Sequence, residues 1–393
     1  MNQEIKKRIE EINNGIVPEG YKQTPFGIFP CDWETKYLDD ICVMQGGGTP
    51  DTKNQYYWEG DIPWISSSDL NEDDFYNVNI TRYITQDAVK KSATKICPSN
   101  SIAVVTRVGV GKIALIDRQY CTSQDFTNII DTKCYTLYLL YQLKSAINRK
   151  LKECQGTSIK GITTKELQKL QIDIPKKEIE QSKIAEILMK WDEMVELQEQ
   201  YIQKLELRKK AIMKKLLTPT KGWENKKLGD VCKIKTGKLD ANAMVENGEY
   251  PFFTCSKEIF TIDKYSFDCE ALLMAGNGDI GDIKYYNGKF DAYQRTYVLS
   301  DFSFNIKYAM YYLLFNFDKD VMKGMQKSSM PYIKLELLQK ADIFYDENTV
   351  NKTVEMLEKV DEEISLQKEK LEKIKIQRKA MQQYLLTGIV RVV

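Results

Sequence analysis

The chain has 393 residues, and its 42% hydrophobic and 11% aromatic side chains predict packed globular structure and exclude a disordered protein. Lysine and arginine number 57 against 56 acidic residues, so bulk charge gives no support for nucleic-acid binding, which must rest on local placement. Histidine is absent, which removes the commonest general base and the commonest transition-metal ligand.

Signatures of common catalytic sites are also missing from the sequence. There is no G-x-x-x-x-G-K-[ST] phosphate loop, no G-x-S-x-G nucleophile elbow and no Asn-Pro-Pro-aromatic tetrapeptide of the kind that amino-methyltransferases carry. The nine cysteines form no C-x-x-C pair, which favours reduced thiols and no metal framework. No apolar run approaches membrane-spanning length. We therefore expect a cytoplasmic protein that is not an enzyme and has no cofactor or metal of its own.

Residues 1–16 have a charged helical pattern, and residues 17–175 form a first globular module. A lead-in rich in proline and glycine ends near Pro30, and the first strand stops at the turn formed by residues 46–50. The expected elements are strands over 37–45, 101–110 and 112–117 and a helix over 136–151. This mixture indicates an α/β or α+β module.

Residues 176–218 are predicted to form one long central helix. Apolar residues recur there at alternating spacings of four and three, which is the heptad pattern of a coiled coil. The apolar seam positions are Ile184, Leu188, Trp191, Val195, Ile202, Leu205, Ile212 and Leu216. Two seam positions are polar, Gln198 and Lys209.

A second globular module follows over residues 219–346. The expected elements are strands over 227–237, 270–276, 281–288 and 293–300 and a helix over 304–317. Residues 276–281 match the G-x-G-x-x-G dinucleotide motif, but that motif requires a helix after the glycines. The residues that follow predict a β-hairpin, so we expect no dinucleotide site there.

Residues 347–393 are predicted to form a C-terminal helix with the same seam. Its apolar positions are Leu357, Val360, Ile364, Leu371, Ile374, Met381 and Leu385. Its polar positions, Gln367 and Arg378, correspond to Gln198 and Lys209 of the central helix. The interruptions of the seam are therefore duplicated together with the seam itself.

The two halves of the chain repeat each other at long range. Trp33 and Gly47 correspond to Trp223 and Gly237 at an offset of 190 residues, whereas the long helices correspond at an offset of 169. The offset between the two copies falls by about twenty residues inside the globular modules and is nearly constant along the long helices. Each half therefore contains a variable module followed by a constrained helix, with a period too long for a solenoid.

The polar seam positions predict how the two long helices pair. Parallel helices in register would place Lys209 beside Arg378 in a desolvated seam, which is unfavourable. Antiparallel helices bring Gln198 onto Gln367, where both amides can donate and accept hydrogen bonds. In that arrangement Lys209 is expected near Glu355, and Arg378 near Glu186. A helix of this length measures roughly 60 Å and would hold the two modules apart.

Basic, amide and hydroxyl side chains on the predicted loops are candidates for DNA contacts. Lysine and arginine can neutralise phosphates, and arginine, asparagine, glutamine and serine can read base edges. The candidates in the first module are Thr49, Lys53, Ser66, Ser67, Arg107, Lys112 and Lys160. Those in the second module are Lys238, Ser256, Lys257, Asn277, Gln294, Arg295 and Lys327.

Four segments together resemble the DNA-specificity subunit of type I restriction-modification enzymes. They are VPEGYKQTPFGIFPCDWE, GGGTPDTKNQYYWEGDIPWISSSDL, RKKAIMKKLLT and its later copy QRKAMQQYLLTGIVRV. The order of recognition module and spacer helix, seen twice, extends the resemblance over essentially the whole chain. The second module departs from it because it lacks the GGGTP and GDIPWI signatures.

The resemblance implies an α+β fold, with two target-recognition domains joined by two long antiparallel helices. It implies a non-catalytic subunit that reads one half-site of double-stranded DNA with each recognition domain. Two methyltransferase subunits would dock on the spacer helices, and motor-nuclease subunits would join them. S-adenosylmethionine, ATP and Mg²⁺ would belong to those partners. A roughly 60 Å helix pair would allow at most about 18 base pairs between the domain centres.

Three alternatives remain open from the sequence. The chain could be the specificity subunit of a related enzyme that cleaves on both sides of its site, with a partner that combines nuclease and methyltransferase. It could be a coiled-coil scaffold whose duplicated modules bind protein. An enzyme would be the third class, and replacing Arg107 or Arg295 would then abolish turnover as well as binding.

Overall fold

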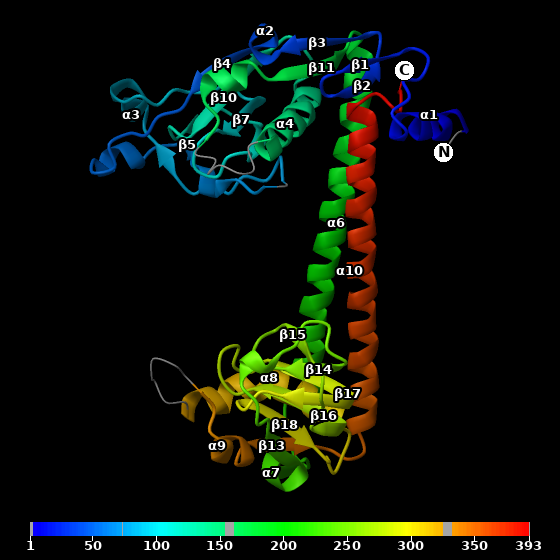
Figure 1. Cartoon of the computed structure of the whole chain (residues 1–393). Helices are drawn as coiled ribbons and strands as arrows, with labels where there is room; N and C mark the ends of the chain where they lie inside the picture. Colours follow the sequence, from blue (N-terminus) through cyan, green and yellow to red (C-terminus); the bar gives the residue numbers. More distant parts are fainter. Residues whose placement is uncertain (1–2, 73, 154–160, 325–331, 393) are drawn as a thin grey trace. The chain divides into compact units, whose positions relative to one another are not determined.

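The computed structural model describes residues 3–72, 74–153, 161–324 and 332–392 and divides into two compact units (Figure 1). Unit 1 comprises Met1–Glu196 and Glu372–Val393, and unit 2 comprises Leu197–Leu371. Two long helices, α6 (Glu178–Leu217) and α10 (Val350–Leu386), each contribute a segment to both units. Within the described ranges, no helix has the length and apolar character needed to cross a membrane.

Unit 1 is an α+β module built around a four-stranded antiparallel sheet in the order β4-β10-β7-β8. The strands of that sheet are β4 (Cys42–Gly46), β7 (Ser101–Val105), β8 (Ile113–Ile116) and β10 (Phe126–Thr132). Three smaller pairings are a β1–β2 hairpin, a β3–β11 ladder and a three-stranded sheet in the order β6-β5-β9. Their strands are β1 (Tyr21–Thr24), β2 (Gly27–Pro30), β3 (Trp33–Tyr37), β5 (Ile62–Ile65), β6 (Tyr83–Ile84), β9 (Cys121–Thr122) and β11 (Gln171–Pro175).

The shorter helices of unit 1 are α1 (Gln3–Asn13), α2 (Leu38–Ile41), α3 (Gln86–Lys91), α4 (Thr136–Glu153) and α5 (Thr164–Gln168), with 3₁₀ turns η1 (Gln55–Trp58) and η2 (Ser67–Asp69). Of these, α2, α4 and α5 contribute buried residues to one core with the sheet and the long helices. Ile102 of β7 and Leu143 of α4 belong to the same buried cluster as Leu188 of α6 and Leu385 of α10. The orientation of the sheet on its helix segments is therefore set by hydrophobic packing.

Unit 2 repeats this plan with a six-stranded sheet in the order β13-β18-β16-β17-β14-β15. Its strands are β13 (Lys233–Thr236), β14 (Tyr250–Phe253), β15 (Ile259–Ile262), β16 (Phe267–Ala275), β17 (Ile283–Ala292) and β18 (Thr296–Ser300), beside a separate ladder of β12 (Glu224–Lys227) and β19 (Asp342–Tyr345). Its helices are α7 (Leu228–Val231), η3 (Ala241–Ala243), α8 (Ile306–Gly324) and α9 (Leu335–Gln339). Leu299 of β18 and Tyr308 of α8 share a core cluster with Leu217 of α6 and Leu357 of α10.

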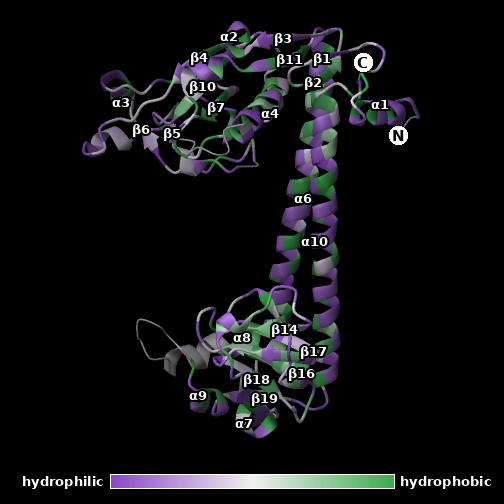
Figure 2. Cartoon of the chain, in the orientation of Figure 1, coloured by the Kyte–Doolittle hydropathy of each residue, from purple (hydrophilic) through white to green (hydrophobic). Residues whose placement is uncertain are grey.

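The two long helices are mainly hydrophilic along their length, with hydrophobic residues at intervals (Figure 2). In unit 1 the expected seam residues Ile184, Leu188 and Leu385 are buried, and in unit 2 Ile202 and Leu205 are buried. This pattern matches a coiled-coil seam with solvated outer faces.

Two segments predicted as continuous strands are interrupted by a short helix. Leu38–Ile41 and Leu228–Val231 are helical turns, so the expected strands over 37–45 and 227–237 were wrong at those residues. The leucine and the apolar residue three positions later are both buried, a spacing that places them on one face of a helix. In both turns the amide of the next cysteine donates to the leucine carbonyl, so the turn ends at Cys42 and at Cys232.

The G-x-G-x-x-G segment of unit 2 joins the antiparallel strands β16 and β17. No helix follows the glycines, which confirms the expected hairpin. The helix dipole that would hold a pyrophosphate is therefore not provided at this segment.

Candidate DNA interface and helix pair

The loops at one end of the unit 1 sheet are held together by main-chain hydrogen bonds. The Thr106 amide donates to the Asp125 carbonyl at 2.8 Å, and the Thr106 carbonyl accepts from the Ile162 amide at 2.8 Å. The Gly47 amide donates to the Phe126 carbonyl at 3.3 Å. The loops after β4 and β7, the turn before β10 and the chain before α5 therefore meet at one edge. We call this set of bonds the loop frame.

Unit 2 contains the same loop frame. The Gly276 amide donates to the Arg295 carbonyl at 3.0 Å, and the Gly276 carbonyl accepts from the Ile333 amide at 2.9 Å. The Gly237 amide donates to the Thr296 carbonyl at 3.4 Å. Corresponding bonds make Thr106 equivalent to Gly276 and Asp125 equivalent to Arg295. The repeat thus extends to the backbone of the loops, where the side chains differ.

A glycine is required in each frame because another backbone passes very close to it. A Cβ added at Gly47 would lie 2.1 Å from the Ser123 carbonyl oxygen, and one added at Gly237 would lie 1.7 Å from the Ala292 carbonyl oxygen. Both neighbours are backbone atoms, which cannot move aside as a flexible side chain could. The matching glycines of the sequence repeat therefore mark close approaches of the chain.

Two of the first module's candidates lie at the unit 1 loop frame. Thr49 donates a hydrogen bond to the Gln124 side chain in the turn before β10. Arg107 is exposed, and its amide approaches the Asp125 carbonyl at 3.3 Å. Lys53 is exposed in the loop after β4. Lys160 lies outside the described residues.

The remaining candidates of unit 1 have structural partners. The Ser66 hydroxyl accepts from the Arg82 guanidinium, and its amide donates to Asp69 at 2.7 Å. The Lys112 ammonium donates to the carbonyl of Ser67 at 3.1 Å and to that of Leu70 at 2.8 Å. Lys112 thus ties the β7–β8 loop to the η2 turn, so its ammonium is already partly engaged.

The second module's candidates gather at the unit 2 loop frame. Gln294 and Arg295 are exposed in the turn between β17 and β18, and the Gln294 side-chain amide donates to the Asp240 carboxylate at 2.7 Å. Asn277 follows Gly276, whose amide is bonded to the Arg295 carbonyl. Gln294 and Arg295 also line a pocket of about 610 Å³, together with Tyr332.

The other candidates of unit 2 surround this frame less closely. Lys238 is exposed directly after Gly237, and Lys257 is exposed directly after Ser256. The Ser256 carbonyl accepts from the Lys284 ammonium at 2.9 Å, which anchors that loop to β17. Lys327 lies outside the described residues.

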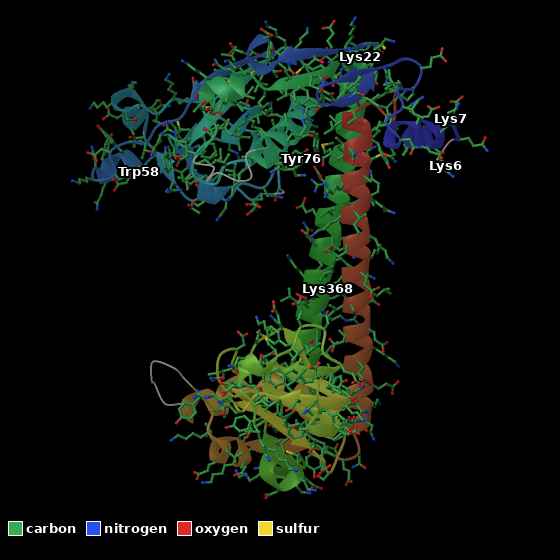
Figure 3. All side chains as sticks on the ribbon, viewed as in Figure 1. Lys6, Lys7, Lys22, Trp58, Tyr76 and Lys368 are labelled. Carbon is green, nitrogen blue, oxygen red and sulfur yellow. The ribbon has the colours of Figure 1, made fainter. Side chains whose placement is uncertain are left out.

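Within unit 2 the segments of α6 and α10 pair in the antiparallel sense. The Gln198 side-chain amide donates to the Gln367 side-chain carbonyl at 2.9 Å, which is the pairing that the antiparallel arrangement predicts. On the flank of the pair, Lys368, which is labelled in Figure 3, forms an ion pair with Glu206 at 2.8 Å.

The expected ion-pair partners of the seam cations were wrong. Lys209 bonds to Asp361 at 2.5 Å instead of Glu355, and Arg378 pairs with Asp192 instead of Glu186. Side chains on a helix lean toward its N-terminus, which in an antiparallel pair is the C-terminal direction of the partner. Each long cation therefore reaches about five residues further along the opposite helix than its Cα level suggests.

A tyrosine from each module completes these ion pairs. In unit 1 the Tyr141 hydroxyl of α4 donates to Asp192 at 2.6 Å, and in unit 2 the Tyr311 hydroxyl of α8 donates to Asp361 at 2.8 Å. Burial raises the pKa of the Asp192 carboxyl, and Arg378 opposes that rise. Each cluster thus joins one module to both long helices by a partly buried polar contact.

The type I restriction modification DNA specificity domain matches this sequence twice, over residues 30–207 and 220–376. The chain belongs to this family. The two matches each span one recognition module and part of a long helix, and the α+β architecture predicted from the resemblance is confirmed. This specificity subunit accordingly recognises a DNA target, which is the function of its family.

Known specificity subunits and solved structures are similar to the chain. The MjaIX specificity subunit of Methanocaldococcus jannaschii is 28% identical over 364 residues, covering 80% of this chain and 83% of the relative. The EcoDI specificity subunit of Escherichia coli is 44% identical over 112 residues, covering 28% of this chain and 25% of the relative. A crystal structure of the Mycoplasma genitalium S subunit superposes with a TM-score of 0.58 at 18% identity, covering 90% of this chain and 96% of that one. A structure from a study of type I complex assembly and conformational transition gives a TM-score of 0.62 at 17% identity, covering 92% and 99%. At these identities the structures show a shared fold.

Sequence reasoning missed several residues of this specificity subunit's loop frames. Gln124 and Asp125 lie in the frame of unit 1, opposite Thr49 and Arg107. Their equivalence to Gln294 and Arg295 is hidden because the repeat offset shifts inside the module. Aligning the two strands that follow these turns, β10 and β18, would have revealed it.

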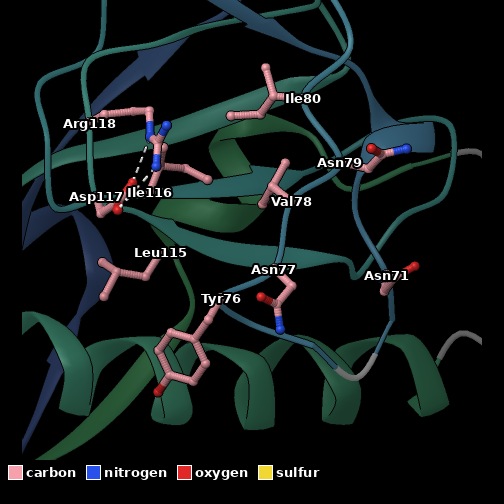
Figure 4. Close-up of a pocket in the computed structure, with 10 residues that line it drawn as sticks. All are labelled: Asn71, Tyr76, Asn77, Val78, Asn79, Ile80, Leu115, Ile116, Asp117 and Arg118. Carbon is pink, nitrogen blue, oxygen red and sulfur yellow. Dashed lines mark hydrogen bonds and ion pairs between the residues drawn. The ribbon is translucent and has the colours of Figure 1, made fainter. Parts of the chain in front are cut away.

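A second pocket in unit 1 of the specificity subunit contains none of the predicted contacts. It has a volume of about 460 Å³ and lies between β8 and the segment around Tyr76 (Figure 4). Asp117 and Arg118 form an ion pair at 2.8 Å on its wall, while the Tyr76 hydroxyl contacts that of Tyr141 at 2.8 Å. The polar groups of these two pairs therefore already have partners within unit 1.

Proposed function

We propose that this specificity subunit reads a bipartite DNA site, with one half-site contacted by each unit. The observation that carries the proposal is the duplicated loop frame, on which the two units present different polar side chains. Arg107 is exposed in the first frame, whereas Asn277 and Arg295 lie in the second. A common backbone with different side chains is suited to reading two different sequences in the same manner.

The chain is proposed to be the non-catalytic member of its complex. The carboxyls with raised pKa values, Asp173 and Asp192, have structural hydrogen-bond partners, Thr35 at 2.6 Å and Tyr141 at 2.6 Å. The chemistry would be supplied by methyltransferase and motor-nuclease subunits, with S-adenosylmethionine, ATP and Mg²⁺ bound to those partners. This assignment follows from the family and is supported by the lack of histidine.

The long helices are proposed to carry the docking surface for the methyltransferase subunits. Leu207 and Leu366 of unit 2 are 64% and 60% exposed, and Met189 and Met194 of unit 1 are also exposed. Solvated faces of a coiled coil usually carry charged residues, so these apolar side chains suit a protein contact.

The bipartite site can be tested by expressing the subunit with its methyltransferase partner in a host without other methylation. Sequencing of the methylated positions should return a motif of two specified segments separated by unspecified base pairs. A single uninterrupted motif would reject the assignment of one half-site to each unit. Methylation without any sequence preference would reject the recognition role altogether.

The docking surface can be tested by co-purification of the two subunits. Leu207→Asp should reduce the recovery of the methyltransferase partner, because it places a charge where apolar contact is expected. Lys204→Asp is a matched control, since Lys204 is an exposed charged residue on the same helix. Equal recovery with both variants would show that this face of α6 does not carry the contact.

A further inference from the structure

One position in the loop frame is structurally equivalent in both units and suited to base reading in each. Arg107 follows Thr106, and Asn277 follows Gly276. The preceding residue uses both its amide and its carbonyl in the frame, at 2.8 and 2.8 Å in unit 1 and at 3.0 and 2.9 Å in unit 2. Arg107 and Asn277 therefore start from corresponding, doubly anchored points of the backbone.

The side chains at this position remain available for a ligand. Arg107 is exposed and Asn277 is partly exposed, and neither makes a side-chain hydrogen bond or ion pair within the described ranges 3–72, 74–153, 161–324 and 332–392. A fixed backbone with an available side chain suits direct readout, because the protein must hold its register on the duplex while the side chain meets a base edge.

Arginine and asparagine both form two hydrogen bonds with a purine in the major groove. Arginine donates twice to the O6 and N7 atoms of guanine, whereas asparagine accepts from N6 and donates to N7 of adenine. We propose that this position reads a purine in each half-site, guanine through Arg107 and adenine through Asn277. The inference rests on the proposed function, in which each unit contacts one half-site.

A purely electrostatic contact explains this position less well. Arg107 could neutralise a phosphate, but Asn277 carries no charge, so the second unit would lose the main source of phosphate affinity. Two other positions of the frame are equivalent in the two units. Gln124 and Gln294 are bonded to the side chains of Thr49 and Asp240, and Asp125 and Arg295 have opposite charges and therefore share no single mode of readout. Purine recognition is the chemistry that the arginine and the asparagine have in common.

The test exchanges the two side chains in the full complex with the methyltransferase subunits. Arg107→Asn should lower the preference for guanine at one position of the first half-site by about 5-fold to 150-fold and favour adenine there. Asn277→Arg should change adenine to guanine at one position of the second half-site. Sequencing of methylated genomic positions measures both motifs at once, and the half-site of the unaltered unit reports that the complex has assembled.

Arg118→Asn is the matched control in unit 1. Arg118 is also an exposed arginine, but it is paired with Asp117 and follows β8 at the opposite end of the β7–β8 hairpin from the loop frame. This variant should leave both half-sites unchanged. A loss of guanine preference with Arg118→Asn as well would indicate a general effect of removing a cation from unit 1.

Two results would overturn the purine-reading position. Unchanged motifs in both exchange variants would show that the side chains read no base, and a uniform loss on all sequences would show a phosphate contact. If Arg107→Asn abolishes methylation altogether, the base preference is measured by competition binding of the complex to four DNAs that differ only at that base. The same ranking of the four DNAs as with the unaltered complex would also reject the proposal. Failure of the proposed bipartite recognition is distinguished from these results, because the motif methylated by the unaltered complex would then not consist of two separated segments.

Discussion

Replacing Arg378 with methionine is expected to destabilise unit 1 because it removes the cation that faces a largely buried carboxylate. The side chains of Arg378 and Asp192 are 18% and 13% exposed, and the Tyr141 hydroxyl is the other donor to Asp192. Loss of one partner from a buried ion pair costs about 3–5 kcal/mol, and the residual exposure places this case near 3 kcal/mol. Methionine retains most of the length of the arginine stem, so little packing is lost.

Urea unfolding followed by tryptophan fluorescence measures this effect mainly in unit 1. Four of the five tryptophans, Trp33, Trp58, Trp64 and Trp191, lie in that unit. With a urea dependence of about 3 kcal/mol per molar, the unfolding midpoint should fall by about 1 M. Lys36→Met is the matched control, because Lys36 and Glu34 form an exposed pair whose loss should leave the unfolding midpoint almost unchanged.

A double variant separates the ion pair from other effects of the substitution. Arg378→Met combined with Asp192→Leu replaces both charges with apolar groups, which should restore much of the lost stability. Tyr141 would keep its contact with the Tyr76 hydroxyl at 2.8 Å. Losses that simply add in the double variant would refute the buried pair as the cause.

The destabilisation should also depend on pH with a defined sign. Burial raises the pKa of Asp192, so its charged form opposes folding above the folded-state pKa, and this penalty is relieved as the pH falls through that pKa. Arg378 lowers that pKa, and its removal should raise the pKa further. The difference in free energy of unfolding between Arg378→Met and the unaltered protein should therefore shrink as the pH falls from neutrality through the raised pKa of Asp192. A difference that grows on acidification would contradict this reasoning.

Three further outcomes follow from contacts in unit 1. Gly47→Ala should weaken binding to DNA with an intact first half-site, because the added Cβ would lie 2.1 Å from a backbone oxygen. Gly46→Ala is the control and should bind normally in the same competition assay, because a Cβ added there has no neighbouring atom within 4 Å. Arg391→Met should lower the free energy of unfolding by about 3 kcal/mol, because the Glu180 side chain, which is 2% exposed, loses its charged partner. Proteolysis of the C-terminal segment should then be faster, and an unchanged rate would argue against this role of the ion pair. Lys112→Met should loosen the η2 turn without changing the salt dependence of DNA binding, and a slope reduced by about one would instead identify a phosphate contact.

The amino-acid sequence was sufficient to predict the organisation of this specificity subunit. The long-range repeat separates variable modules from constrained helices, and the period of the apolar residues defines the helix seams. The polar interruptions also favoured antiparallel pairing, because equivalent cations would repel each other in a parallel seam. Gln198 and Gln367 meet accordingly in unit 2. These inferences were possible because helical periodicity and like-charge repulsion are local or pairwise properties of the sequence.

The sequence placed several candidates on the correct loops without showing which of them face one another. Arg107, Asn277 and Arg295 were selected as loop residues, and their contacts with DNA stay predictions. Lys112 was selected for its charge, but its ammonium is engaged by two carbonyls of the same unit. Charge and loop position alone cannot distinguish an available cation from one that anchors a neighbouring loop.

The partners of the seam cations and the equivalence of the loop frames depend on tertiary contacts that the sequence does not reveal. Lys209 and Arg378 pass the expected glutamates because side chains lean along the helix, a displacement that counting residues does not capture. Asp125 and Arg295 correspond through hydrogen bonds to residues about 19 positions away in the chain. Such bonds depend on how strands and loops meet in space, so local sequence patterns determine the elements and their faces, and tertiary packing determines which side chains share a site.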